Sequence, residues 1–126
     1  MMEGPMPESK LTIAERETGD VTILTLTGQI LLDDGDLAIR SHVHALMDRG
    51  RLKIIVDLGG VTYMDSAGVG MIAGKLKTLR DRGGDMKLLN LTTRGQRLFG
   101  MMKLQLLFET FDNEDMAVKS FAFNSR

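Results

Sequence analysis

The feature that most constrains the fold is the corner at residues 63–70, Tyr-Met-Asp-Ser-Ala-Gly-Val-Gly, where an apolar run gives way to a helical pattern. Just upstream, residues 54–58 form a mostly apolar, β-branched run, which is typical of a strand buried on both faces. Downstream, apolar residues recur at helical spacing, at Val69, Ile72, Ala73, Leu76 and Leu79. A buried strand followed by an amphipathic helix predicts a parallel sheet covered by helices.

Ser66 occupies the predicted start of that helix, and the residues alone allow it two roles. Its hydroxyl can accept a hydrogen bond from an unpaired amide of the first turn, which is the N-cap role. The same amides and the positive end of the helix dipole also favour a phosphate group at this position. Ser66 is therefore either a structural cap or a site for a phosphate.

The first half of the chain predicts an antiparallel hairpin and a helix. Polarity alternates from Leu11 onward, a turn signal covers residues 18–20, and residues 21–27 form a second strand that Gly28 ends. The helix that follows closes at Gly50. Three aspartates are candidate caps for its start: Asp33, Asp34 and Asp36.

The second half predicts two further strands and two further helices, besides the helix after Ser66. The helix after Ser66 ends at Gly83-Gly84, and a strand follows at residues 86–90. A capping box of Thr93 and Gln96 starts the next helix. A short strand is expected at residues 106–108, and Asp112 is the expected cap of the last helix. The residues expected to face the core from the last two helices are Leu98, Met101, Met102, Ala117, Val118 and Phe121.

This order of elements predicts an α/β fold. Strands that alternate with helices require right-handed parallel crossovers, so we expect a mostly parallel sheet with one antiparallel strand from the N-terminal hairpin, and four helices. Sites in such sheets form at the carboxyl ends of the strands. The acidic loop at residues 28–36 and the Asp65-Ser66 corner are therefore expected to lie close together.

Composition and charge argue against several classes of protein. The 126 residues suit one domain, which we expect at residues 11–123 after a mobile tail at residues 1–10. The net charge of -1 indicates no basic surface for nucleic acid, and no apolar run is long enough to cross a membrane. With no cysteine and no secretory signal pattern, we expect a cytoplasmic protein without disulfides.

Motifs for catalysis and for cofactors are missing from the sequence. There is no GxGxxG turn and no P-loop, and the glycines of residues 68–70 fall inside the predicted helix. Ser66 lacks the preceding glycine of a hydrolase elbow. His42 and His44 point to different faces of one helix, and nothing in the sequence brings either to Ser66. The Asp33-Asp34 pair offers too few oxygens for a cation cage. We expect no enzyme activity, no cofactor and no metal.

Residues 65–70, Asp-Ser-Ala-Gly-Val-Gly, carry a resemblance to a known family. The corner resembles that of the STAS-domain anti-sigma-factor antagonists, small bacterial proteins in which an Asp-Ser pair is followed by a small residue, glycine, an aliphatic residue and glycine. The match holds at every position of this motif. It extends over about residues 11–123, through Gly28, Asp57-Leu58 and the strands at 87–90 and 106–108. The resemblance implies the STAS fold.

The resemblance also implies a signalling role. In that family the unphosphorylated antagonist binds an anti-sigma factor that is also a serine kinase, and so frees the sigma factor. Phosphorylation of the motif serine abolishes binding, and a serine phosphatase restores it. Carried onto this chain, the phospho-acceptor is Ser66. The implied partner-binding residues are Asp33 or Asp34 after the second strand, and Met64, Asp65, Ser66, Ala67, Gly68 and Val69 at the corner.

Two alternatives stay open at the level of the sequence. The chain is either such a phosphorylation-switched antagonist, or a phosphate-independent STAS scaffold or ligand-sensing module of another signalling assembly, in which Ser66 is only a cap. The glycines at positions 68 and 70 likewise allow the helix start to pack closely either against a partner or against the protein's own sheet.

Overall fold

The computed structural model describes residues 10–31 and 34–124, and the side chains of residues 34–36, 123 and 124 lie outside this description. The predicted tail therefore lies outside it except for Lys10, and so does Asp33. In chain order the elements are β1 (Leu11–Thr18), β2 (Val21–Ile30), α1 (Asp34–Asp48), β3 (Lys53–Met64), α2 (Ser66–Asp81), β4 (Asp85–Leu89), α3 (Thr93–Met101), β5 (Thr110–Phe111) and α4 (Glu114–Asn124).

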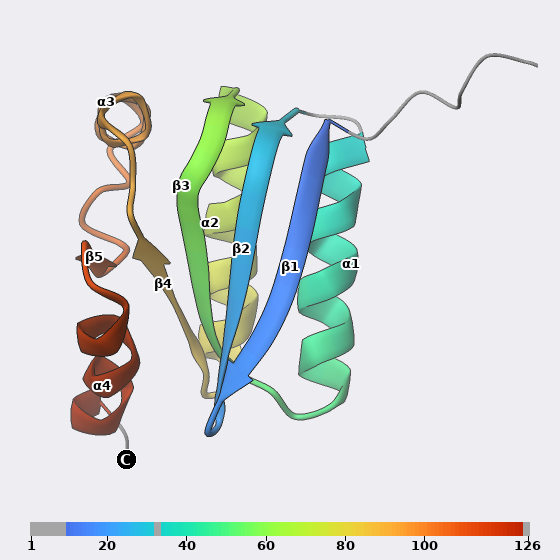
Figure 1. Ribbon diagram of the computed structural model, residues 1–126, viewed down its shortest axis with the longest axis vertical. Helices are drawn as coiled ribbons and strands as arrows, with labels where there is room; N and C mark the ends of the chain where they lie inside the picture. Colours follow the sequence, from blue (N-terminus) through green and yellow to red (C-terminus); the bar gives the residue numbers. More distant parts are fainter. Residues whose placement is uncertain (1–9, 32–33, 125–126) are drawn as a thin grey trace, which may run out of the picture.

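The strands form one sheet in the order in which they occur along the chain, β1-β2-β3-β4-β5 (Figure 1). β1 pairs with β2 in the antiparallel direction, from Leu11 opposite Gly28 to Thr18 opposite Val21. All other neighbouring strands are parallel. This topology confirms the predicted α/β fold, with its antiparallel edge strand and its four helices.

Helices cover the two faces of the sheet unequally (Figure 1). α1 and α2 lie along one face, whereas α4 lies beside β4 and β5 at the other end of the sheet. Successive residues of β3 point to opposite faces, so Ile54 and Val56 join the larger core under α1 and α2, and Ile55 joins a smaller core under α4. The strand at residues 54–58 is thus buried on both faces, as predicted. The smaller core contains Val21, Ile23, Ile55, Leu89, Ala117 and Phe121.

A fully buried lysine holds α4 against the sheet. Lys87 on β4 has 0% of its surface exposed, and its ammonium Nζ donates to Oγ of Ser120 on α4 at 2.7 Å. The same Nζ lies 2.8 Å from Oε1 of Glu109 and 4.4 Å from the centre of the Phe121 ring. These contacts link β4 to α4. They also offset the cost of burying the cation, which is high when the cation is unpaired.

An ion pair makes a second link to α4. The guanidinium of Arg16 on β1 donates to both carboxylate oxygens of Glu114, the first residue of α4. These hydrogen bonds lower the pKa of the Glu114 carboxyl below its ordinary value. Both side chains are partly exposed, so solvent screens the pair. It orients the start of α4 more than it stabilises the fold.

The two central strands run further than the sequence predicted. β2 does not end at Gly28 but continues to Ile30, with irregular pairing between Gly28 and Gln29. Gly28 has φ of +113°, and a Cβ atom there would lie 2.0 Å from the carbonyl oxygen of Lys10. The glycine therefore allows two backbones to approach closely inside the strand, and its prediction as a strand end was wrong. β3 likewise continues beyond residue 58 to Met64.

Two helix caps differ by one residue from the prediction. α3 is capped by Thr92, whose Oγ1 accepts a hydrogen bond from the backbone N–H of Gly95 at 3.0 Å. The capping box predicted at Thr93 is therefore wrong. α4 begins after Asn113, whose Oδ1 accepts from the backbone N–H of the third residue of the helix at 3.0 Å. Asp112 is not the cap, because Asn113 occupies the position that reaches the free amides.

The segment between α3 and β5 also differs from the prediction. Residues 106–108 form a turn instead of a strand, since the backbone N–H of Leu107 donates to the carbonyl of Leu104 at 3.0 Å. Met101 does not face the core but is 72% exposed at the end of α3. The buried aromatic ring on that helix belongs to Phe99, which the predicted apolar face did not include.

Candidate functional site

The corner lies where the carboxyl ends of β2 and β3 meet. Ile30, the last residue of β2, pairs with Met64, the last residue of β3. The backbone N–H of Asp65 donates to the carbonyl of Ile30 at 3.3 Å, which joins the two strand ends. The predicted proximity of the two loops is confirmed at this point. Asp33 lies outside the described residues, and Asp34 is placed only by its backbone, as the first residue of α1.

Asp65, and not Ser66, is the N-cap of α2. Its backbone is extended, with φ −92° and ψ 172°, and its Oδ1 accepts a hydrogen bond from the N–H of Gly68 at 2.8 Å. Its carbonyl accepts from Val69 at 3.2 Å, which begins the ladder of the helix. The possible role of Ser66 as the cap is therefore wrong. Strand β3 ends at Met64, so the residue directly after it takes the capping position.

Ser66 is the first residue of α2 and lies on the surface, as does Ala67. Within residues 10–31 and 34–124, its hydroxyl makes no hydrogen bond. The other corner residues point inward: Met64 and Val69 belong to the larger core, and Gly68 is buried beside them. Contact of all these residues with a partner stays a prediction. Among the corner residues 64–69, Ser66 and Ala67 are exposed and Asp65 is half-buried.

The two glycines of the motif have different surroundings. A Cβ atom on Gly68 would lie 2.8 Å from Cγ2 of Ile30 and 3.3 Å from the Ile30 carbonyl oxygen, so Gly68 lets α2 pack against the protein's own sheet. A Cβ atom on Gly70 would meet nothing within 4 Å. Packing against the protein's own sheet therefore explains the glycine at position 68. It does not explain the glycine at position 70, which open space surrounds.

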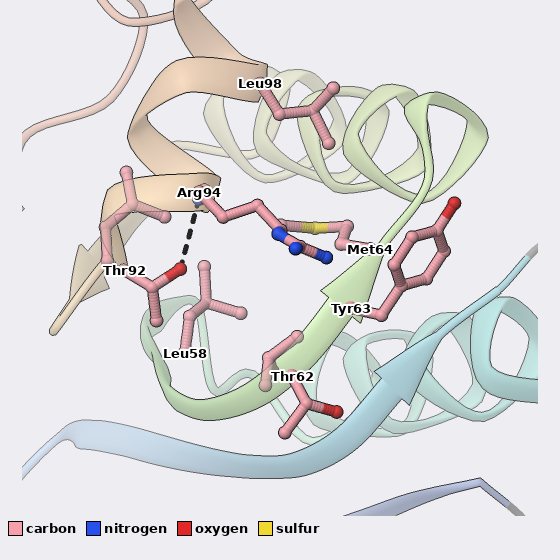
Figure 2. A pocket seen from close by; sticks show the side chains of 10 residues that line it. Leu58, Thr62, Tyr63, Met64, Thr92, Arg94 and Leu98 are labelled. Carbon is pink, nitrogen blue, oxygen red and sulfur yellow. Dashed lines mark hydrogen bonds between the residues drawn. The ribbon is translucent and has the colours of Figure 1, made fainter.

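A small pocket adjoins the corner on the side of α3 (Figure 2). Leu58, Tyr63 and Met64 of β3 line one wall, and Thr92, Arg94 and Leu98 line the other. Figure 2 shows the Arg94 side chain extending from α3 across the pocket towards β3. The sequence carries no signal for this residue at the corner, because Arg94 is distant from Ser66 along the chain and only the pairing of β3 with β4 brings α3 alongside.

The described residues contain no group of three or more His, Asp or Glu side chains placed to hold a metal ion. His42 lies 3.4 Å from a carboxylate oxygen of Glu15, whereas His44 lies 2.9 Å from Nζ of Lys75, so the two rings face different neighbours as predicted. None of the helices in the described part of the chain combines the length and the apolar character needed to cross a membrane.

Two curated relatives of this chain are anti-sigma factor antagonists. An anti-sigma F factor antagonist of Paenibacillus polymyxa is 29% identical over 94 residues, which cover 75% of this chain and 80% of that protein. An anti-sigma-B factor antagonist of Listeria monocytogenes is 31% identical over 101 residues, 79% of this chain and 85% of that protein.

Solved structures share the fold. The anti-sigma factor antagonist SpoIIAA in its unphosphorylated form superposes with a TM-score of 0.77 at 20% identity, over 89% of this chain and 97% of that one. SpoIIAA of Bacillus in its phosphorylated form superposes with a TM-score of 0.70 at 22% identity, over 86% of this chain and 98% of that one. The STAS domain family matches residues 12–117. The chain therefore belongs to the STAS domain family, and its curated relatives are anti-sigma factor antagonists.

Proposed function

We propose that this protein is an anti-sigma-factor antagonist that acts by partner switching, with Ser66 as the phospho-acceptor. The unphosphorylated form binds an anti-sigma factor with serine kinase activity and so releases the sigma factor. Phosphorylation of Ser66 abolishes this binding, and a serine phosphatase reverses the modification. The names of the relatives support the role as an antagonist. The phosphorylated form of SpoIIAA, which shares this fold, supports a phosphate-controlled step.

The main support for the proposal is that Asp65, and not Ser66, caps α2. Asp65 caps α2, so the hydroxyl of Ser66 is not needed to close the helix. Ser66 is exposed at the start of α2, where a kinase can reach it. An exposed hydroxyl that makes no hydrogen bond within the described part of the chain is available for transfer of a phosphoryl group.

The surroundings of Ser66 explain how a phosphate would act on a partner. Phosphorylation adds about -1.5 to -2 charges at neutral pH. The positive end of α2 stabilises charge at its first residue, so we expect the fold itself to survive. Leu37 in the first turns of α1 and Tyr63 on β3 are 58% and 42% exposed near the same edge of the sheet. A partner that buries these side chains would have to desolvate the phosphate, which is costly.

Calorimetry with candidate anti-sigma factor kinases tests the proposal. We expect wild type and Ser66→Ala to bind alike, and Ser66→Asp to bind at least tenfold more weakly, which corresponds to about 1.4 kcal/mol. Ser41→Asp is the matched control, because Ser41 is an exposed serine on α1 and the change in charge is the same. In the presence of ATP, mass spectrometry should find one phosphate, at Ser66.

Two results would contradict the proposal. Equal binding by wild type, Ser66→Asp and Ser41→Asp would mean that charge at the corner does not control the complex. A phosphate on another residue, with Ser66 unmodified, would remove Ser66 as the acceptor. Either result would favour the alternative, a phosphate-independent STAS scaffold or ligand-sensing module.

A further inference from the structure

Among the described residues that line the pocket beside the corner, Arg94 is the one cation. It comes from the second residue of α3, and the other wall of the same pocket contains Tyr63 and Met64. Ser66 follows Met64 by two residues, a distance of at most about 7 Å along the chain. The side chain of Arg94 extends towards Met64 near the end of β3, two residues before Ser66 (Figure 2).

Arg94 is exposed, and its guanidinium makes no hydrogen bond and no ion pair within residues 10–31 and 34–124. The same holds for Arg82 and Arg97, whereas other arginines have protein partners. Arg16 pairs with Glu114, Arg51 donates to Thr22, and Arg80 donates to Asp85. None of the described residues that line the pocket is acidic. The carboxylate nearest to Ser66 in sequence, Asp65, is already bound to the amide of Gly68. In the unphosphorylated protein the donors of Arg94 thus face solvent and have no partner among the described residues.

We infer that Arg94 receives the phosphate of phosphorylated Ser66 within the same chain. The planar guanidinium presents paired N–H donors that match two phosphate oxygens, and such charge-assisted hydrogen bonds are among the strong ones. The first amides of α2 contribute from the other side of the phosphate. The inference rests on the proposed function, because it concerns the phosphorylated form of Ser66.

This contact has a consequence for the switch. In the unphosphorylated protein the Arg94 side chain lines the pocket that also contains Tyr63 and Met64. In the phosphorylated protein it is drawn towards Ser66 and its charge is neutralised. Phosphorylation would then alter both the charge and the position of an arginine that shares a pocket with the exposed Tyr63.

Phosphorus NMR on protein that carries phosphoserine at position 66, introduced during synthesis, tests the inference without any kinase. The quantity measured is the second pKa of the phosphate, about 6 for phosphoserine. We expect Arg94→Gln to raise this pKa by about 0.5 unit or more relative to the phosphorylated wild type, because a cation nearby favours the dianion. Arg97→Gln is the matched control, since Arg97 is exposed on the same helix and does not line the pocket. We expect it to leave the pKa unchanged.

Each outcome decides the question. An equal pKa in wild type and Arg94→Gln would overturn the inference, and so would an equal rise in Arg94→Gln and Arg97→Gln, which would indicate only the net charge of α3. A pKa that does not respond, together with loss of kinase binding in unphosphorylated Arg94→Gln, would assign Arg94 to a carboxylate of the partner instead. A rise in the phosphate pKa that is specific to Arg94→Gln supports the inference even if no kinase modifies Ser66. The kinase experiment tests the proposed function separately, so its failure can be distinguished from failure of the inference.

Discussion

Two neighbouring side chains at the corner have different partners. Asp65 accepts a backbone hydrogen bond from Gly68 and closes the first turn of α2, whereas Ser66 faces solvent. A carboxylate at this position also interacts favourably with the positive end of the helix. Stability and modification therefore depend on separate residues, which allows Ser66 to change its charge without loss of the cap.

This separation predicts different costs for two alanine substitutions. We expect Asp65→Ala to lower the free energy of unfolding by about 1 kcal/mol, the usual cost of losing an N-cap. Ser66→Ala should change it by less than about 0.5 kcal/mol, as for most surface substitutions. Urea unfolding followed by circular dichroism measures both. An equal loss in the two variants would contradict the assignment of the cap to Asp65.

Among the elements, α2 packs closely against β2 because position 68 is a glycine. Gly68 lies so close to Ile30 that a Cβ atom would be 2.8 Å from Cγ2 of that residue. Ile30 is fully buried, and a β-branched side chain has few alternative rotamers, so it cannot move aside freely. The position of the helix start, and with it that of Ser66, depends on this contact.

Alanine at the two glycines of the motif should therefore have opposite effects. We expect Gly68→Ala to destabilise the protein by about 1–3 kcal/mol through overpacking. Gly70→Ala should stabilise it by about 0.5–1 kcal/mol, because Gly70 is inside a helix and surrounded by open space. Thermal and urea unfolding of the two variants, compared with wild type, provide the measurement. Destabilisation by Gly70→Ala would mean that position 70 is more crowded than the structure shows.

At the scale of the whole molecule, the sheet is covered by two unequal layers. The larger core lies under α1 and α2, and the smaller core under α4 depends on Lys87 as well as on apolar contacts. Glu109, the carboxylate partner of Lys87, is 51% exposed and remains accessible to water. The apolar stem of the lysine therefore matters more for stability than its charge.

Two substitutions of Lys87 test this view. Lys87→Ala should destabilise the protein by about 3 kcal/mol, because it removes a buried stem and leaves a cavity. Lys87→Met should cost about 1 kcal/mol or less, since it keeps an unbranched stem and Glu109 can be hydrated. Urea unfolding measures both, and hydrogen exchange should show faster exchange in α4 for Lys87→Ala. An equal loss of stability in the two variants would mean that the ion pair with Glu109, and not the apolar stem of Lys87, holds α4 against the sheet.

Much of the fold follows from local patterns. The alternation from Leu11, the buried run at residues 54–58 and the helical spacing after Val69 each predict an element that the structure contains. Burial of one face of an element produces a periodic pattern, and burial of both faces of a strand produces a longer apolar run; a single sequence shows both patterns. The apolar triplet at residues 106–108 is too short for either pattern. Its first residue, Leu106, is 91% exposed in a turn.

Patterns among neighbours along the chain are enough to predict the α/β class, the order of the elements and the position of the Asp-Ser pair after a buried strand. Which of two adjacent polar residues caps α2 depends on tertiary contacts, since the pairing of Met64 with Ile30 sets where β3 ends. Tertiary contacts also place Gly68 against the sheet and Arg94 in the pocket beside the corner. These are contacts between residues distant in sequence, which no local pattern encodes.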